Sequence, residues 1–378
     1  DIEAEPGELR SWAWVVAPDA GLAWVPLPAG DAARDAAEAL RMALAQGSGA
    51  GSDVSALARR LDSLRLAPLA EHLRDVEVLQ VVPGEVLAGV PPAVLVTPSG
   101  EYRHERHALV VSPWASPPDV IGAAAAEAPA ETRGLLAVAD PPFSRAQAAA
   151  MLAGDGTPLP APSPRGVMRA VVRGDRDQLH LLPRLPSTRH EVADIAPYFG
   201  EAEVLLGADA SEANLLDQQR DERLGSYDVI HLATHALVDA QRPQRSALVL
   251  SQLDPEPDDG LLTAAEIAAG WRLRAELVTL SACETGLGRP TPGDGYLGFT
   301  QAFLQAGARN VLVSLWQVDD RATSLLMRRF YENLQRRDLD AAAALAEAQR
   351  WLRGYEVRGQ AVFADPRDWG AFVLVGSD

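Results

Sequence analysis

Two stretches of the chain contain residue types that could support nucleophilic catalysis. Residues 227–236 form an apolar, β-branched run that ends in Thr234, His235 and Ala236, and residues 276–286 form a similar run that reaches Cys283, the only cysteine of the chain. Such runs are typical of buried parallel strands that end in a loop. In open α/β sheets, chemistry collects beyond the carboxyl ends of the strands. The two stretches therefore predict an imidazole and a thiol at one edge of a sheet.

This pairing favours a cysteine nucleophile with a histidine base. A thiol becomes reactive when a base within hydrogen-bond reach removes its proton, and adjacent parallel strands, about 4.8 Å apart, can present both groups together. We therefore predict that His235 and Cys283 are catalytic. The backbone amides of Ala236 and Cys283 are the candidate oxyanion donors, because such donors occur at strand–loop junctions. The alternative is that Cys283 is a small buried apolar residue without a catalytic role.

A metal site at His231 and His235 is a second alternative. Histidines four residues apart bind zinc when they lie on a helix, and in metallopeptidases a glutamate follows the first of them. Here the run before His231 is β-branched, and Leu232 follows it. We predict no metal and interpret His231 as a histidine of the core or a support for the catalytic residues.

The glycines at 293, 295 and 298 match the dinucleotide-binding pattern G-x-G-x-x-G. In that motif the glycines follow their strand directly, whereas a long loop separates these from the strand that precedes Cys283. We therefore expect no nucleotide and no other cofactor.

Charge and composition exclude several classes of protein. The chain has 378 residues and a formal net charge of −18, which argues against nucleic acid or an anionic membrane as the main partner. A single cysteine permits no internal disulfide bond, and no apolar run reaches the roughly 18 residues that span a bilayer. We expect a cytoplasmic protein. The chain begins without Met, so we expect a fragment whose N-terminal neighbours are absent.

The elements that must position these residues alternate between strands and helices from residue 187 onward, which predicts a mainly parallel sheet with helices on both faces. Before residue 187 we expect a hairpin over 11–28 and a mobile Pro-, Gly- and Arg-rich surface loop over 154–176. A Ser or Thr cap then opens a helix that is expected to cover 187–199. Other expected helices cover 31–46, 54–73, 211–216, 263–269, 296–306, 321–335 and 339–353. Other expected strands cover 76–82, 108–112, 134–140, 202–206, 247–251, 310–316 and 371–375.

An ordered set of motifs resembles a known family. The set includes His231-Leu-Ala-Thr-His-Ala and Leu280-Ser-Ala-Cys-Glu-Thr-Gly, and it continues at residues 259–267, 293–295, 307–320 and 368–376. Together they resemble the CHAT family of caspase-like cysteine peptidases, which are relatives of separase and often occur with tetratricopeptide repeats. The resemblance covers about residues 67–376.

The resemblance implies an α/β fold: a caspase-like three-layer sandwich with a mainly parallel central sheet, preceded by a degenerate caspase-like N-terminal half. We expect a hairpin and helices over 1–66, the degenerate half over 67–185 with its flexible loop 154–176, and the active half over 186–378.

The implied function is a cysteine endopeptidase that cleaves a protein partner through a His235–Cys283 dyad and a thioester. We expect regulation by partner domains that this chain lacks, such as tetratricopeptide repeats, and a role in bacterial defence or cell death. Many members have Gly where this chain has Ala236, and some members act as scaffolds. The alternative is therefore a catalytically silent CHAT-like interaction scaffold.

Substrate preference depends on three acids near the predicted site. Asp294, Asp319 and Asp320 are candidates for a pocket that binds a basic P1 residue, as in separase and metacaspase relatives. The alternative is that Asp319 and Asp320 cap the helix that begins at Arg321. If the enzyme cleaves after Arg, the loop around Arg165, Arg169 and Arg173 is a candidate self-processing segment.

Overall fold

The computed structural model describes most of the chain. Backbone and side chains are described for 11–17, 21–28, 30–45, 53–112, 134–153, 167, 171, 176–239, 241–253, 259–281 and 298–376, and the backbone alone for 2–5, 8–10 and 294–297. Cys283 and most of the loop predicted over 154–176, including Arg165, Arg169 and Arg173, lie outside these residues.

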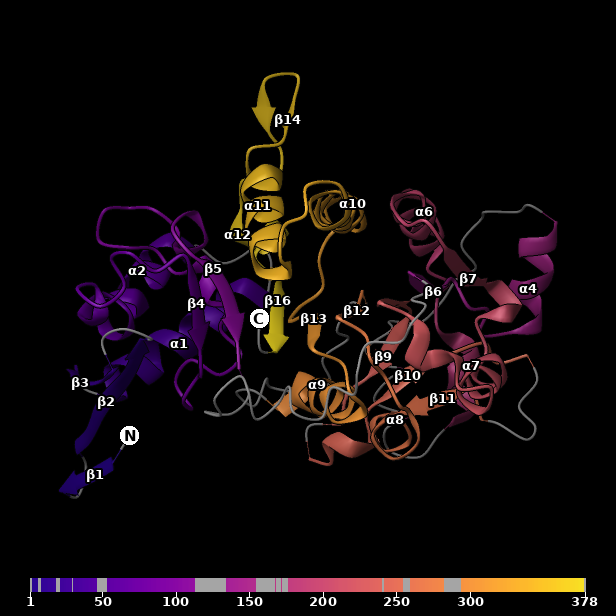
Figure 1. The fold of residues 1–378 in the computed structure, drawn as a ribbon, viewed down its shortest axis with the longest axis horizontal. Helices are drawn as coiled ribbons and strands as arrows, with labels where there is room; N and C mark the ends of the chain where they lie inside the picture. Colours follow the sequence, from indigo (N-terminus) through magenta and orange to yellow (C-terminus); the bar gives the residue numbers. More distant parts are fainter. Residues whose placement is uncertain are drawn as a thin grey trace.

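An eight-stranded sheet crosses the described part of the molecule in the order β4-β5-β16-β13-β12-β8-β6-β7 (Figure 1). Neighbouring strands pair in parallel, except that β16 and β13 pair antiparallel. The predicted mainly parallel sheet is therefore confirmed. The strands are β4 (Val78–Val81), β5 (Ala108–Val111), β6 (Leu135–Ala139), β7 (Ala202–Leu206), β8 (Val229–Ala233), β12 (Leu277–Leu280), β13 (Asn310–Ser314) and β16 (Phe372–Gly376).

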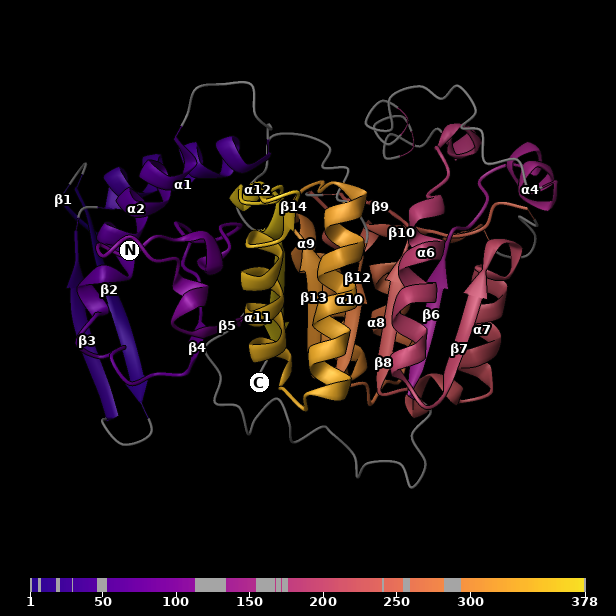
Figure 2. The ribbon, with the colours of Figure 1, turned by 90° about the horizontal axis from the view of Figure 1, so that it is seen from above.

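Helices cover both faces of this sheet. In Figure 1, α6 (Pro186–Ile195), α10 (Asp320–Arg336) and α11 (Ala341–Arg353) lie above the strands, and in Figure 2 the same three helices lie in front of them. The opposite face carries α7 (Glu212–Arg220), α8 (Ala264–Gly270) and α9 (Asp294–Ala306). The result is the predicted three-layer arrangement.

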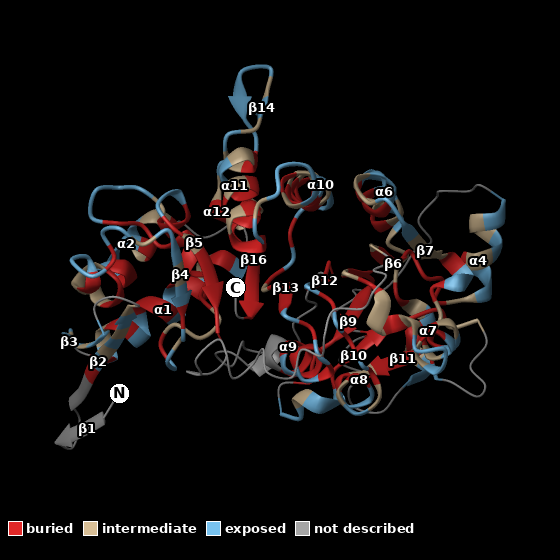
Figure 3. Cartoon of the chain, viewed as in Figure 1, coloured by how far each residue is buried: buried red, intermediate tan, exposed pale blue. Residues whose placement is uncertain are grey.

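The strands are apolar on both faces, and this explains why the sheet is covered on both sides. Along β6, Leu135, Ala137 and Ala139 belong to one hydrophobic core, whereas Leu136 and Val138 belong to the other. All five are fully buried. Successive side chains of a strand point to opposite faces, so a continuous apolar run needs a helical layer on each side. Figure 3 shows the inner strands of this sheet as buried, whereas the edge strands β4 and β7 are mostly intermediate or exposed.

A second, smaller sheet begins at the predicted catalytic histidine. It consists of β9 (His235–Leu237), β10 (Ala247–Val249) and β11 (Leu261–Thr263), all antiparallel. The strand predicted over 247–251 is therefore present in part, but it lies in this sheet and not in the parallel one. The chain leaves β8 at Thr234, whose hydroxyl donates to the carbonyl of Val249 and fixes the change of sheet.

The N-terminal region contains the predicted hairpin and helices. β1 (Ile2–Glu5), β2 (Glu8–Ala17) and β3 (Gly21–Leu27) form an antiparallel sheet, followed by α1 (Gly30–Ala45) and α2 (Val54–Arg65). Trp14 and Trp24 are register partners with ring centroids 4.7 Å apart, and 62% and 58% of their surfaces are exposed. The other face of the hairpin packs toward the core through Val15 and Val25.

The remaining elements are short. Besides short 3-10 helices, they are α4 (Arg145–Leu152), α12 (Pro366–Trp369), β14 (Glu356–Val357) and β15 (Gln360–Ala361). The prediction of a Ser or Thr cap for α6 is wrong. The helix expected to begin with a Ser or Thr cap begins at Pro186 instead, and Leu185 precedes it without a side-chain cap. Proline suits the first helical position because it has no N–H to satisfy there. The hydroxyl of Thr188 instead accepts a hydrogen bond from the amide of Asp140.

Strands from both sides of residue 186 share the central sheet, because β6 lies between β8 and β7. The predicted division into 1–66, 67–185 and 186–378 describes units that would fold separately. Strand order alone does not show whether these units fold separately, so the division stays a prediction.

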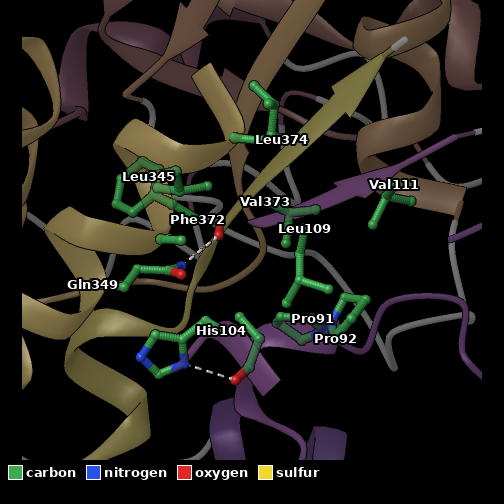
Figure 4. Close-up of a pocket in the computed structure, with 13 residues that line it drawn as sticks. Pro91, Pro92, His104, Leu109, Val111, Leu345, Gln349, Phe372, Val373 and Leu374 are labelled. Carbon is green, nitrogen blue, oxygen red and sulfur yellow. Dashed lines mark hydrogen bonds between the residues drawn. The ribbon is translucent and has the colours of Figure 1, made fainter. Parts of the chain in front are cut away.

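A buried histidine lies where residues of the N-terminal half pack against α11 and β16. His104 lines a small cavity of about 10 Å³ together with Pro91, Pro92 and Gln349 (Figure 4). Its Nδ1–H donates to the carbonyl oxygen of Ala93 at 3.0 Å, and its Nε2 has no hydrogen-bond partner among the described residues. Burial lowers the pKa of His104 to about 4.

His104 should make the free energy of unfolding depend on pH. Its pKa is about 6.5 when unfolded and about 4 when folded, so the unfolded chain binds the proton first as the pH falls. The stability that the neutral ring contributes is complete at a pH above the pKa of His104 in the unfolded chain. It is lost as the pH falls toward the pKa of His104 in the folded protein. We expect a loss of about 2 kcal/mol from this group between about pH 7 and pH 4.5.

The measurement is urea unfolding of the wild type and His104→Gln at both pH values. The variant should lose about 2 kcal/mol less than the wild type on acidification. Equal losses in the two proteins would show that another group is responsible.

Candidate functional site

The central sheet brings the two predicted catalytic stretches to one edge. β8 and β12 are parallel neighbours, with His231 opposite Thr279 and Leu232 opposite Leu280. The pairing continues to Ser281, whose amide donates to the carbonyl of Leu232 at 3.0 Å. His235 follows β8 by two residues. Cys283 lies two residues beyond Ser281, outside the described residues, so its position relative to the imidazole stays a prediction.

The hydrogen bonds of His235 define its tautomer. Its Nε2 lies 2.8 Å from the carbonyl oxygen of Pro183, and a carbonyl can only accept, so Nε2 carries the proton. The other ring nitrogen, Nδ1, is buried and has no hydrogen-bond partner among the described residues. In the neutral ring this nitrogen has a free lone pair. His235 is therefore held as a base at Nδ1.

The surroundings of His235 favour the neutral ring. Only 4% of the residue is exposed, and the ring of Phe143 lies 5.3 Å from the imidazole between centroids. Burial lowers the pKa of His235, and the bond to Pro183 offsets part of that effect. A lowered pKa keeps the imidazole unprotonated at neutral pH, which is the form a general base requires.

Ala236 lies in β9, opposite Leu248 of β10. It is not among the residues with a left-handed backbone, so alanine causes no strain where many members of the family have glycine. Its role as an oxyanion donor stays a prediction, as does that of the Cys283 amide.

His231 is fully buried in a hydrogen-bonded network that links two strands to two helices. Its Nε2 lies 2.9 Å from Glu191 of α6, and its Nδ1 lies 3.1 Å from the hydroxyl of Tyr331 in α10. That hydroxyl also lies 2.7 Å from Thr279 of β12, the register partner of His231. Burial raises the pKa of Tyr331. The interpretation of His231 as a histidine of the core is confirmed by its burial, and its role as a support for the catalytic residues stays a prediction. Among the described residues, no three His, Cys, Asp or Glu side chains form a group that could hold a metal ion.

The three acids of the predicted substrate pocket lie at the N-terminal ends of two helices, α9 and α10. Asp319 caps α10, because its Oδ1 accepts hydrogen bonds from the amides of Arg321 and Ala322 at 3.0 and 3.1 Å. Asp320 is the first residue of that helix, and Asp294 is the first residue of α9, where side chains are not described. The capping alternative is thus confirmed for Asp319. The pocket itself stays a prediction for all three.

Pro183 and Phe143 were missed by sequence reasoning. Pro183 lies 52 residues before His235, and its contribution is a backbone carbonyl, which every residue type has. Phe143 follows β6 at the same edge of the sheet as His235, and only the strand order reveals that proximity.

These features define an α/β protein with a buried, neutral histidine at the carboxyl edge of a mainly parallel sheet. The chain matches the family model described as "CHAT domain" over residues 55–377, and it belongs to that family. The predicted membership is confirmed.

Two mammalian proteins are similar over part of the chain. Tetratricopeptide repeat protein 28 of Mus musculus is 41% identical over 118 residues, and that of Homo sapiens is 38% identical over 124 residues. These segments are 31% and 33% of this chain but only 4% and 5% of the relatives. The relatives are therefore far longer proteins named for tetratricopeptide repeats. A bacterial origin of this chain stays a prediction.

Two solved structures overlap with the fold at low sequence identity. The Arg-specific cysteine proteinase gingipain R aligns with 91% of this chain and 74% of its own, at 9% identity and a TM-score of 0.46. A chain of the Saccharomyces cerevisiae separase–securin complex aligns with 71% of this chain, over 14% of its own length, at 11% identity and a TM-score of 0.37. In the described part of this chain, no helix is both long and apolar enough to cross a membrane.

Proposed function

We propose that this chain is a cysteine endopeptidase in which His235 and Cys283 form the catalytic dyad. The observation that carries the proposal is the state of His235: Nε2 donates to Pro183, and Nδ1 is a buried base without a partner among the described residues. Membership of the CHAT family supports the same conclusion. The parallel pairing of β8 with β12 supports it as well, because Ser281, two residues before Cys283 in the sequence, lies at the edge of the sheet that His235 follows.

The mechanism proceeds through a thioester. Nδ1 of His235 takes the proton of the Cys283 thiol, and the thiolate attacks the carbonyl carbon of the scissile peptide bond. The amides of Ala236 and Cys283 hold the resulting oxyanion. When the C–N bond breaks, the imidazolium gives its proton to the leaving amine. Nδ1 then takes a proton from water as the water oxygen attacks the thioester carbonyl. The C–S bond breaks, the imidazolium returns its proton to the Cys283 thiolate, and the product leaves with its new carboxyl group.

The proposed substrate is a protein partner with a basic residue at P1. The acids Asp294 and Asp320 lie at the start of helices that follow the catalytic edge, and a carboxylate there would pair with a lysine or arginine side chain. Asp319 can contribute only its second oxygen, because Oδ1 is used by the helix cap.

The proposed regulation comes from partner domains. The mammalian relatives carry a similar segment within much longer proteins named for tetratricopeptide repeats, which supports control by such repeats. A role in defence or cell death is proposed from the family resemblance. The alternative function, a catalytically silent scaffold, shares the fold and differs in the reactivity of Cys283.

A peptidyl electrophile with arginine at P1 should label the chain once. Because Cys283 is the only cysteine, intact mass reports that residue alone. We expect the adduct to be absent in Cys283→Ala, strongly slowed in His235→Ala, and formed faster in the wild type than a simple alkylating agent of equal intrinsic reactivity predicts. A panel with other P1 residues tests the basic preference. Labelling no faster than that of free cysteine across the whole panel would favour the scaffold.

A further inference from the structure

Residues 140–147, which follow β6, form hydrogen bonds and an ion pair with the residues on either side of Pro183. Asp140 comes directly after β6 and is fully buried. Its carboxylate accepts two hydrogen bonds from Arg184, from Nη2 to Oδ2 at 2.7 Å and from Nε to Oδ1 at 3.2 Å. Arg184 is the residue next to Pro183. The charged pair therefore anchors the backbone on one side of the carbonyl that accepts from His235.

Gln147 anchors the other side. Its Nε2 donates to the carbonyl oxygen of Leu182 at 2.7 Å, and its Oε1 accepts from the amide of Phe143 at 2.8 Å. Phe143 itself is buried against the imidazole of His235. Residues on both sides of Pro183 are thus tied to residues 140–147, and the same segment packs against the catalytic histidine.

Asp140 occupies this position at an energetic cost. It has a left-handed backbone with φ of 52°, which is unfavourable for residues other than glycine, although Asp tolerates it better than most. Its carboxylate is also removed from water, which is unfavourable unless the charge is paired. Arg184 and Arg189 provide that pairing, the latter from Nε to Oδ2 at 3.0 Å. Strained, buried charges of this kind occur where the surrounding structure requires one geometry.

We propose that Asp140 and Gln147 are positioning residues that hold the carbonyl oxygen of Pro183 on Nε2 of His235, so that Nδ1 remains the basic nitrogen. This inference rests on the proposed function, in which Nδ1 activates Cys283. A shift of Pro183 would remove the one acceptor among the described residues that fixes the proton on Nε2. The ring could then carry its proton on Nδ1, and that tautomer offers no lone pair to the thiol.

The chain offers a matched pair of variants for the test. Arg184 and Arg189 both donate to the carboxylate of Asp140, but only Arg184 adjoins Pro183. Arg184→Met removes the anchor and keeps the length of the side chain. Arg189→Met removes an ion pair whose arginine side chain is 42% exposed, and Asp140 keeps both bonds from Arg184, so the effect on stability should be small.

The first measurement is the tautomer of His235, read by NMR from the ¹⁵N shifts of protein labelled only at its seven histidines and assigned with His235→Gln. We expect an unprotonated Nδ1 in the wild type and in Arg189→Met at neutral pH. Arg184→Met should show a mixture of tautomers. Gln147→Met should show the same mixture, and it takes the place of Arg184→Met if that variant does not fold.

The second measurement is the rate of alkylation of Cys283 across pH, read by intact mass. Arg184→Met should react at least ~10-fold more slowly near neutral pH, because activation by the base is impaired. Arg189→Met should stay within about twofold of the wild type. Arg184→Lys should recover part of the rate, because it restores the charge without the two-bond geometry.

The outcomes separate this inference from the proposed function. An unchanged tautomer in both Arg184→Met and Gln147→Met overturns the inference, even if the alkylation rate falls. If Cys283 of the wild type reacts like a free thiol, the proposed function is wrong, yet the tautomer comparison still decides whether residues 140–147 position His235.

Discussion

Replacement of His235 by glutamine should lower kcat/KM for a P1-arginine peptide by about three orders of magnitude. Glutamine is similar in size and can still donate to Pro183, but it cannot take the proton of a thiol. The reaction would then depend on the small fraction of thiolate present without a base. The measurement is hydrolysis of a fluorogenic peptide by wild type, His235→Gln and Cys283→Ala.

His190→Gln is the matched control, because His190 is an exposed histidine of α6. Its activity should equal that of the wild type. A His235→Gln variant with full activity, beside an inactive Cys283→Ala, would assign the base to another residue.

The pH profile adds a second readout. Because burial lowers the pKa of His235, the base form persists to lower pH than that of an ordinary histidine, and the acidic limb of kcat/KM should lie below about pH 6.5.

Replacement of Asp62 by alanine should lower the free energy of unfolding by about 3–5 kcal/mol. Asp62 of α2 accepts from Arg103 through both oxygens, at 2.6 Å from Nε and 2.8 Å from Nη2, and both side chains are buried. Burial raises the pKa of Asp62, and the bonds from Arg103 offset part of that rise. Removal of the carboxylate leaves a guanidinium buried without its partner. Urea unfolding followed by tryptophan fluorescence measures the loss.

The control is the double variant Asp62→Leu/Arg103→Met, which replaces both charges by apolar groups. It should recover most of the stability, because the cost arises from one unpaired charge. A double variant as unstable as Asp62→Ala would show that the loss comes from packing.

The same experiment tests the predicted boundary at residue 66. Arg103 lies beyond that boundary and Asp62 before it, so the pair joins two predicted units. A single unfolding transition in the wild type would indicate that 1–66 unfolds together with the rest, and two transitions would support a separate unit.

Regular elements of the fold were predictable where residues 187–376 alternate between apolar strands and capped helices. Ser211, for example, was expected to open a helix, and its hydroxyl accepts from the amide of Asn214. The small antiparallel sheet was not predictable, because it depends on a change of direction at Thr234 and on pairing with residues 247–249. Thr188 could not be assigned either, since its partner Asp140 is distant in the sequence.

The candidate site was predictable only for side chains with distinctive chemistry. His235 and Cys283 were apparent because an imidazole and a lone thiol follow strands that would be neighbours. Pro183 acts through its backbone carbonyl, which every residue type has. The side chain of Gln147 donates to the backbone carbonyl of Leu182, a partner 35 residues away that the sequence does not reveal. Asp319 has a distinctive residue type, but that type was compatible with both a substrate pocket and a helix cap. The structure shows that its Oδ1 accepts a hydrogen bond in the helix cap.

The place of β16 has a consequence for synthesis on the ribosome. β16 lies between β5 and β13 in the sheet, yet it follows every other strand in the sequence. The strands that carry the candidate site, β6, β8 and β12, with β7 and β13, can pair as they emerge. β4 and β5 are made first but can join them only after β16 has been translated. The unpaired edges of β4 and β5 are therefore exposed for the longest time during synthesis. A chaperone that shields nascent strands would be needed most at these two strands.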